Sequence, residues 1–182
     1  RYLLITTTEG TDDRYAVFIL DMRRPAAGVR PLISGLDNKW ELVGSEGARL
    51  IFLTDKDAPR GRLVTMDARR PSTPVEIVGQ REATLQSAQR VGNRLILSYL
   101  GDASSQAEIV DLAGNRVSQL TLGAIGTAAG FDGSAQSSET FYAFTSYNRP
   151  TTIYRLDTAT NQTTVFAAPA VSFDPNDYSI EQ

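Results

Sequence analysis

The stretch Arg49-Leu-Ile-Phe-Leu-Thr54 is a run of β-forming residues. A polar loop over 55–61 follows it, and then comes a second run, Arg62-Leu-Val-Thr-Met-Asp67. A third short run, Pro74-Val-Glu-Ile-Val78, completes the repeat unit. Short runs of aliphatic and β-branched residues, separated by Gly, Pro and Asp, predict strands joined by turns. We therefore expect residues 49–78 to form three neighbouring antiparallel strands.

The same repeat unit occurs four times along the chain. Every copy closes its second run with an aspartate, and these aspartates are spaced by 46, 44 and 46 residues: Asp21, Asp67, Asp111 and Asp157. A period in the forties built from short strands is typical of the blades of a β-propeller. The innermost strand of a blade is expected ahead of each complete copy, over 40–43, 84–90 and 124–131. The first copy lacks this strand, so the prediction is an all-β fold of fifteen strands.

The predicted β-propeller covers residues 1–168, as about three and a half four-stranded blades near 1–36, 37–80, 81–122 and 123–168. Residues 169–182 lose the pattern and are expected to be a linker, with a possible strand over 178–182. Such a chain could close as a four-bladed ring, but an arc of a larger ring is the favoured interpretation. Because an open arc exposes strand edges, we expect it to need the rest of a longer parent chain, from which Arg1–Gln182 looks excised.

The composition excludes several kinds of chemistry. The 182 residues contain no His and no Cys, so this chain alone cannot assemble a Ser-His-Asp triad, a thiolate nucleophile or a disulfide. The usual zinc ligands are missing too, and we expect neither a metal nor a cofactor. The net charge is −3 and basic residues are not clustered, which argues against nucleic acid or an anionic membrane as partner. No apolar stretch approaches the ~20 residues of a membrane helix.

Several conspicuous residues have plain structural interpretations. An aspartate that ends a strand commonly accepts backbone hydrogen bonds from the turn that follows, which is the role we expect for the four repeated aspartates. The sequence Asp55-Lys-Asp57 resembles the start of a calcium loop, but it lacks the remaining ligand spacing, and a solvated hairpin tip is expected. The glycines of the stretch Gly123-x-x-Gly126-x-x-x-Gly130 are expected at close packing near the axis of the ring. Trp40 is expected to pack in the core or between blades.

Three further stretches are distinctive: Arg1-Tyr-Leu-Leu-Ile-Thr-Thr-Thr-Glu-Gly10, then Glu139-Thr-Phe-Tyr-Ala-Phe-Thr-Ser146 with Ile153-Tyr154, and the tail Phe173-Asp-Pro-Asn-Asp-Tyr178. These stretches resemble the β-propeller of prolyl oligopeptidases, the serine peptidases that cleave short peptides after proline. They occur in the family's order and spacing, and the resemblance runs almost from end to end. It implies the C-terminal half of a seven-bladed ring, followed by an α/β-hydrolase domain that carries the Ser, Asp and His.

The resemblance also implies a function. The parent would be a serine endopeptidase whose propeller restricts access to short proline-containing peptides, while this chain alone would be inactive. Its partners would be its own peptidase domain and the remaining blades, in a soluble protein of the cytoplasm or a bacterial periplasm. The alternative is a non-catalytic propeller that binds a protein or peptide on its loop face.

Two groups of candidate site residues follow from the resemblance and the repeat. The stretch Thr8-Glu9-Gly10-Thr11 aligns with a family loop that shapes the outer substrate subsites, where the family commonly has Arg in place of Thr8 and Cys in place of Thr11. Loss of the Arg removes a cation with a forked set of donors. Equivalent loops are expected to contact the peptidase domain through Asp12, Asp13, Asp55, Lys56, Asp57, Tyr147, Asn148 and Arg149.

Overall fold

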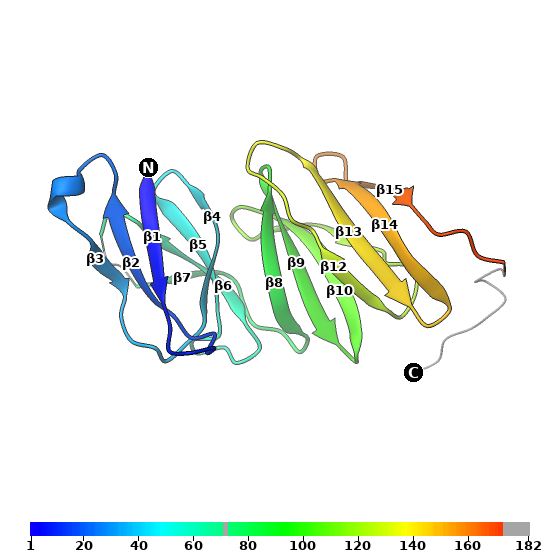
Figure 1. Ribbon diagram of the computed structural model, residues 1–182, viewed down its shortest axis with the longest axis horizontal. Helices are drawn as coiled ribbons and strands as arrows, with labels where there is room; N and C mark the ends of the chain where they lie inside the picture. Colours follow the sequence, from blue (N-terminus) through cyan, green and yellow to red (C-terminus); the bar gives the residue numbers. More distant parts are fainter. Residues whose placement is uncertain (71–72, 173–182) are drawn as a thin grey trace. The chain divides into compact units, whose positions relative to one another are not determined.

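The computed structural model describes residues 1–70 and 73–172, and these fold into four antiparallel sheets (Figure 1). In every sheet the strands lie in sequence order, which is the up-and-down arrangement of a propeller blade. The described residues contain fifteen strands, as predicted, and one 3-10 turn, η1 (Pro25–Ala27). None of the described residues forms a helix long and apolar enough to cross a membrane.

The first sheet has three strands and each of the others has four. Their bounds are β1 (Tyr2–Thr7), β2 (Ala16–Asp21) and β3 (Arg30–Ile33); β4 (Trp40–Glu46), β5 (Arg49–Thr54), β6 (Arg62–Asp67) and β7 (Val75–Val78); β8 (Thr84–Val91), β9 (Arg94–Gly101), β10 (Ser104–Asp111) and β11 (Arg116–Leu120); β12 (Thr127–Gly130), β13 (Glu139–Ser146), β14 (Arg149–Asp157) and β15 (Gln162–Ala167). The possible strand over 178–182 lies outside the described residues.

The chain divides into two compact units, residues 1–81 and 82–182, each with two sheets and a core of its own. In the first unit Val17 and Ile19 of β2 pack with Val64 of β6 around the aromatic pair Trp40 and Phe52. The two rings meet edge to face, with centroids 6.0 Å apart, an arrangement that aromatic pairs favour. The predicted core position of Trp40 is confirmed.

The core of the second unit is a stack of three aromatic rings. Tyr142 of β13 lies between Phe131 and Tyr154, with centroid distances of 4.7 and 5.1 Å. Burial raises the pKa of the Tyr142 phenol above its ordinary value, because ionisation would place a charge in this apolar surrounding. Ile109 and Leu156 are fully buried in the same cluster.

The four repeated aspartates close turns, as predicted. Each accepts the backbone N–H of the residue two positions on, at 2.8–3.0 Å. The side chain of Arg69 adds a forked pair of hydrogen bonds to Asp67 and holds the pKa of this carboxyl well below its usual range. These hydrogen bonds stabilise the turn that follows the second run of each copy.

After the runs 94–99 and 140–145 the sequence predicts loops that extend to Gln106 and to Thr151, and both connections are shorter than predicted. The expected loop up to Gln106 is a two-residue hairpin at Asp102 and Ala103, both with left-handed φ angles (47° and 51°). This conformation matches the twist of two-residue hairpins. The expected loop up to Thr151 is likewise reduced to residues 147–148. The polar residues that suggested loops instead continue the ladders, because the rims of these sheets are open enough to accept them.

Two inner strands also differ from their predicted bounds. β4 continues through Gly44 to Glu46, with a bulge between Leu42 and Gly44 that lets the strand pass the glycine. β12 begins three residues later and ends one residue earlier than the predicted 124–131, and at its end Phe131, at φ +70°, turns the chain out of the strand. The predicted close packing is confirmed at Gly126, where an added Cβ would lie 2.3 Å from the carbonyl oxygen of Thr145. It is wrong for Gly123, where an added Cβ would meet no atom within 4 Å and only the φ of +81° favours glycine.

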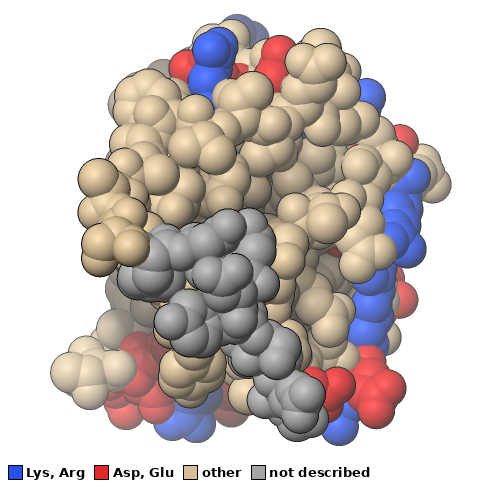
Figure 2. All heavy atoms as spheres, turned by 90° about the vertical axis from the view of Figure 1, so that its right-hand side faces the viewer, with Lys and Arg blue, Asp and Glu red and all other residues tan. Residues whose placement is uncertain are grey.

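The first and last sheets each leave an apolar face exposed, as expected for part of a ring. Leu3 and Ile5 of β1 are 46% and 38% exposed. On β13–β15, Phe141 and Phe166 meet edge to face at 4.9 Å while Phe166 stays 65% exposed. Figure 2 looks at the end of the chain that carries these strands, and uncharged atoms cover most of it, with charged residues towards its borders.

Gly126 provides a test of the close packing. Gly126→Ala should lower the free energy of unfolding by about 3 kcal/mol, because the new Cβ cannot be accommodated without moving β13. Gly123→Ala is the matched control. It meets no atom within 4 Å and bears only the strain of a left-handed φ of +81°, about 1 kcal/mol. Urea denaturation followed by circular dichroism measures both, and equal losses would contradict this account.

Candidate functional site

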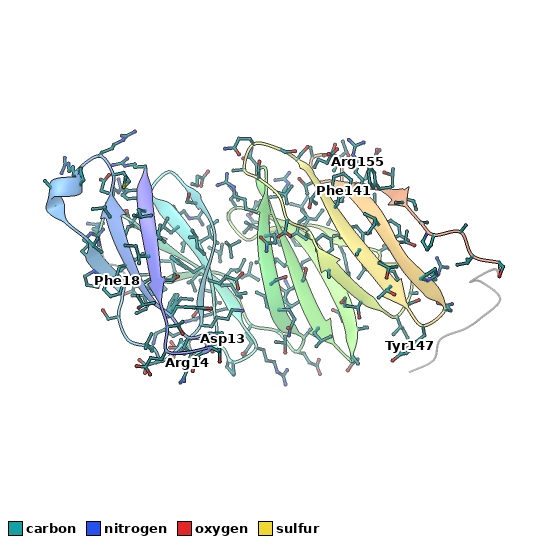
Figure 3. The ribbon with its side chains drawn as sticks, viewed as in Figure 1. Asp13, Arg14, Phe18, Phe141, Tyr147 and Arg155 are labelled. Atoms are coloured by element: carbon teal, nitrogen blue, oxygen red, sulfur yellow. The ribbon has the colours of Figure 1, made fainter. Side chains whose placement is uncertain are left out.

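The candidate residues lie in connections between the second and third strands of a blade. The β1–β2 connection spans residues 8–15 (hereafter loop 8–15), and the β5–β6 connection spans 55–61; both belong to the first unit. Tyr147 and Asn148 form the β13–β14 hairpin of the second unit, and Arg149 lies on β14 rather than in a loop. Figure 3 shows Asp13 and Arg14 beyond the ends of β1 and β2, and Tyr147 at the end of β13.

Loop 8–15 has a defined internal structure. The Thr8 hydroxyl donates to the carbonyl oxygen of Asp12 at 2.6 Å, and the Asp12 N–H donates to the Glu9 carbonyl oxygen at 3.2 Å. Gly10 has φ +60° and open space around its Cα, so the conformation of the turn, not crowding, favours glycine there. Thr8, Glu9, Gly10 and Thr11 are all exposed. The Thr8 hydroxyl is used within the loop, whereas Glu9 and Thr11 each add an exposed polar side chain.

An ion pair between Asp12 and Arg14 closes the loop. Arg14 donates its backbone N–H and its Nε–H to Asp12 Oδ1, both at 2.9 Å, and its Nη2 also contacts Oδ2. The side-chain hydrogen bond from Arg14 is the main reason that the pKa of Asp12 falls to about 2, and the same contact raises the pKa of Arg14. Arg14 was not among the predicted site residues. The Asp-x-Arg spacing that Asp67 and Arg69 share could have indicated it.

The β3–β4 connection joins loop 8–15 to the β5–β6 connection. The Tyr15 N–H donates to the carbonyl oxygen of Asn38 at 3.1 Å, and the Lys39 N–H donates to Asp55 Oδ1 at 2.8 Å. Arg14 and Lys39 form an isolated antiparallel bridge between the two segments. The structure therefore brings Asp12, Asp13 and Asp55 into one hydrogen-bonded set of connections.

The other predicted contact residues of the β5–β6 connection are more open. The Asp57 side chain is 71% exposed and lies 3.5 Å from an Arg62 nitrogen and 4.0 Å from Lys56 Nζ. Pairs this exposed contribute little to stability. Their charges are therefore available to a partner surface.

Tyr147 stands at the tip of its hairpin and is 96% exposed, while the neighbouring Ser146 hydroxyl contacts Asn148 Oδ1 at 2.8 Å. Beside the ring lies a hollow of about 330 Å³, and Ala103, Ile125 and Thr127 form part of its wall. Within residues 1–70 and 73–172, no charged side chain lines this hollow. An aromatic ring next to an uncharged hollow is a surface that could take an apolar group of a partner.

Removing Arg14 tests the ion pair. In Arg14→Ala the pKa of Asp12 should rise from about 2 towards the ordinary ~3.9, because the carboxylate loses its main hydrogen-bond donor. With the depressed pKa, Asp12 stabilises the fold above about pH 4, and this contribution is lost as the pH falls towards 2. A carboxyl ¹³C NMR titration measures the shift, with Arg24→Ala as control. An unchanged Asp12 pKa in Arg14→Ala would contradict the assignment.

Comparison with known proteins places this geometry in a family. Residues 1–169 match the model of the prolyl oligopeptidase N-terminal β-propeller domain. A prolyl endopeptidase of Elizabethkingia miricola is 30% identical over 184 residues, which cover 100% of this chain and 26% of that protein. Prolyl oligopeptidase ophP of Omphalotus olearius is 28% identical over 163 residues, covering 85% and 22%.

Solved structures agree in fold. A prolyl endopeptidase structure at 30% identity superimposes with a TM-score of 0.88 over 100% of this chain and 27% of its own. Prolyl oligopeptidase B of Galerina marginata, at 16% identity, gives a TM-score of 0.85 over 97% of this chain and 26% of its own. The chain thus spans about a quarter of the length of these relatives. It belongs to the prolyl oligopeptidase family, as part of the family's N-terminal β-propeller domain.

Proposed function

We propose that this chain is the C-terminal half of a seven-bladed propeller that gates a prolyl oligopeptidase-type serine endopeptidase. The family match over residues 1–169 carries the proposal. The chain contains no His, so the catalytic His would come from the remainder of the protein, in an α/β-hydrolase domain with the Ser and Asp. The propeller would restrict the peptidase to short peptides that contain proline.

Loop 8–15 is the proposed substrate-facing element. Its tip is exposed, and the Asp12–Arg14 pair keeps it in one conformation, so little ordering is needed when a peptide binds. With the Thr8 hydroxyl committed to Asp12, the carboxylate of Glu9 and the hydroxyl of Thr11 are the groups offered to the outer residues of a peptide. A loop with these groups would favour peptides that present a donor or a cation at that distance from the scissile bond.

The proposed contacts with the peptidase domain use both units. Lys56 and Asp57 would supply charge, with Asp13 beside them on loop 8–15. Tyr147 would supply an apolar anchor, with Asn148 and Arg149 beside it. The exposure of Tyr147 and the uncharged hollow next to it also fit a non-catalytic propeller that binds a protein or peptide, which is the second candidate function.

Thr11→Trp in the full-length protein tests the proposal. The bulky ring should lower kcat/KM for octapeptides with an internal proline about tenfold, because it fills the outer subsite. A dipeptidyl reporter that ends at the scissile proline should change less than twofold. Thr160→Trp, an exposed threonine on the β14–β15 turn, is the control.

Two outcomes would overturn the proposal. Identical kinetics of Thr11→Trp at every peptide length would remove loop 8–15 from the substrate path. A full-length protein without proline-specific turnover would favour the binding propeller instead.

A further inference from the structure

The β3–β4 connection, residues 34–39, is hydrogen-bonded to two other connections of the first unit. Its carbonyl oxygen at Asn38 receives the Tyr15 N–H, and its Lys39 N–H donates to Asp55. Gly35 at φ +85° curls the segment so tightly that a Cβ there would lie 2.8 Å from the Asp37 carboxylate. A segment bonded on both sides transmits a displacement from one side to the other.

Asp55 is the fixed end of this link. Immediately before it, Thr54 is fully buried, and its hydroxyl oxygen accepts the Lys56 N–H at 3.1 Å. The Asp55 carbonyl oxygen accepts the N–H of the buried Ala58 at 2.9 Å. Both bonds set the backbone of Asp55 against the core, so its carboxylate is presented to Lys39 in one position.

Loop 8–15 is the dependent end. Tyr15 is half-buried and packs against the core cluster of the first unit, and its N–H is bonded to Asn38. Arg14 directly precedes Tyr15 and forms the ion pair with Asp12, whose carbonyl oxygen accepts the Thr8 hydroxyl. The hydrogen bonds in this series are all 3.1 Å or shorter.

We propose that Asp55 is a positioning residue for loop 8–15 and that, through Lys39 and Asn38, it sets how the protein discriminates peptides by length. Asp55 touches no substrate in this scheme. Its carboxylate holds the backbone of 38–39, which in turn holds Tyr15 and the loop. The role in discrimination rests on the proposed function of loop 8–15, whereas the mechanical link stands on the hydrogen bonds alone.

Three variants of the full-length protein test the proposal. Asp55→Ala removes the acceptor for the Lys39 N–H. Asp55→Asn keeps an oxygen acceptor at the same position and should restore the link. Glu46→Ala removes an exposed carboxylate at the opposite end of the same sheet, where it pairs with Arg49 at 3.6 Å, and serves as the control.

Hydrogen–deuterium exchange with mass spectrometry gives the first readout. In Asp55→Ala the fragments that contain Tyr15 and Lys39 should exchange at least tenfold faster, since a hydrogen bond to a charged acceptor is lost. In Asp55→Asn and Glu46→Ala their exchange should stay close to that of the parent. Unchanged exchange in Asp55→Ala would overturn the proposal.

Peptide kinetics give the second readout. In Asp55→Ala the KM for proline-containing octapeptides should rise about tenfold with kcat within twofold, while a dipeptidyl reporter keeps both constants. Asp55→Asn should restore the octapeptide KM. Faster exchange in Asp55→Ala with an unchanged KM at every peptide length would also overturn the proposal. It would show that the link exists but that loop 8–15 does not face substrate. The two readouts therefore distinguish a failure of the proposed function from a failure of the link.

Discussion

The central strands of this chain bury apolar side chains on both of their faces, and the rest of the structure depends on this. Leu50, Ile51, Phe52 and Leu53 of β5 point alternately to opposite sides, yet all four are almost completely buried. Leu95, Ile96 and Leu97 of β9 repeat the pattern. Each such side chain contributes roughly 1.5–3 kcal/mol when removed from water, so a sheet covered on one face alone would lose much of its stabilisation. Sheets of this kind are stable when stacked, and a propeller stacks them.

The same constraint explains the two ends of the chain. On β1 and on β13–β15 one face carries the same apolar types, but Leu3, Ile5 and Phe166 remain substantially exposed. A complete ring would provide cover for both faces. The relatives are about four times as long as this chain.

Much of the fold could be predicted because its signals are local. Short runs of β-forming residues predicted the fifteen strands, and the aspartate that ends each second run predicted the turns, since its carboxylate accepts the N–H two residues on. The length of the Asp102–Ala103 hairpin could not be predicted, because polar residues serve equally well in loops and at strand rims. The end of β12 depends on the packing of Phe131 against Tyr142, a contact made across the sheet.

In the candidate site too, local features could be predicted and contacts between separate segments could not. The position of Thr8 to Thr11 on a connection followed from the repeat, and the Asp12–Arg14 pair follows a spacing visible elsewhere in the chain. The link from Asp55 through Lys39 and Asn38 to Tyr15 could not be predicted. It joins the backbone of Tyr15 and of residues 38–39 to one carboxylate, and the backbone groups leave no trace in residue type.

The connections at the two ends of the strands differ in how freely they can be exchanged with those of relatives. The turn after Asp111 is closed by hydrogen bonds among residues 111–115, so it could be replaced by the turn of a relative as a short segment. Loop 8–15 has no such independence, because its last residues are bonded to 38–39 and these to Asp55. A designer who wished to transplant the peptide preference of a relative would have to move three separate pieces of sequence together, and a library that varied loop 8–15 alone would sample mostly loops without their support.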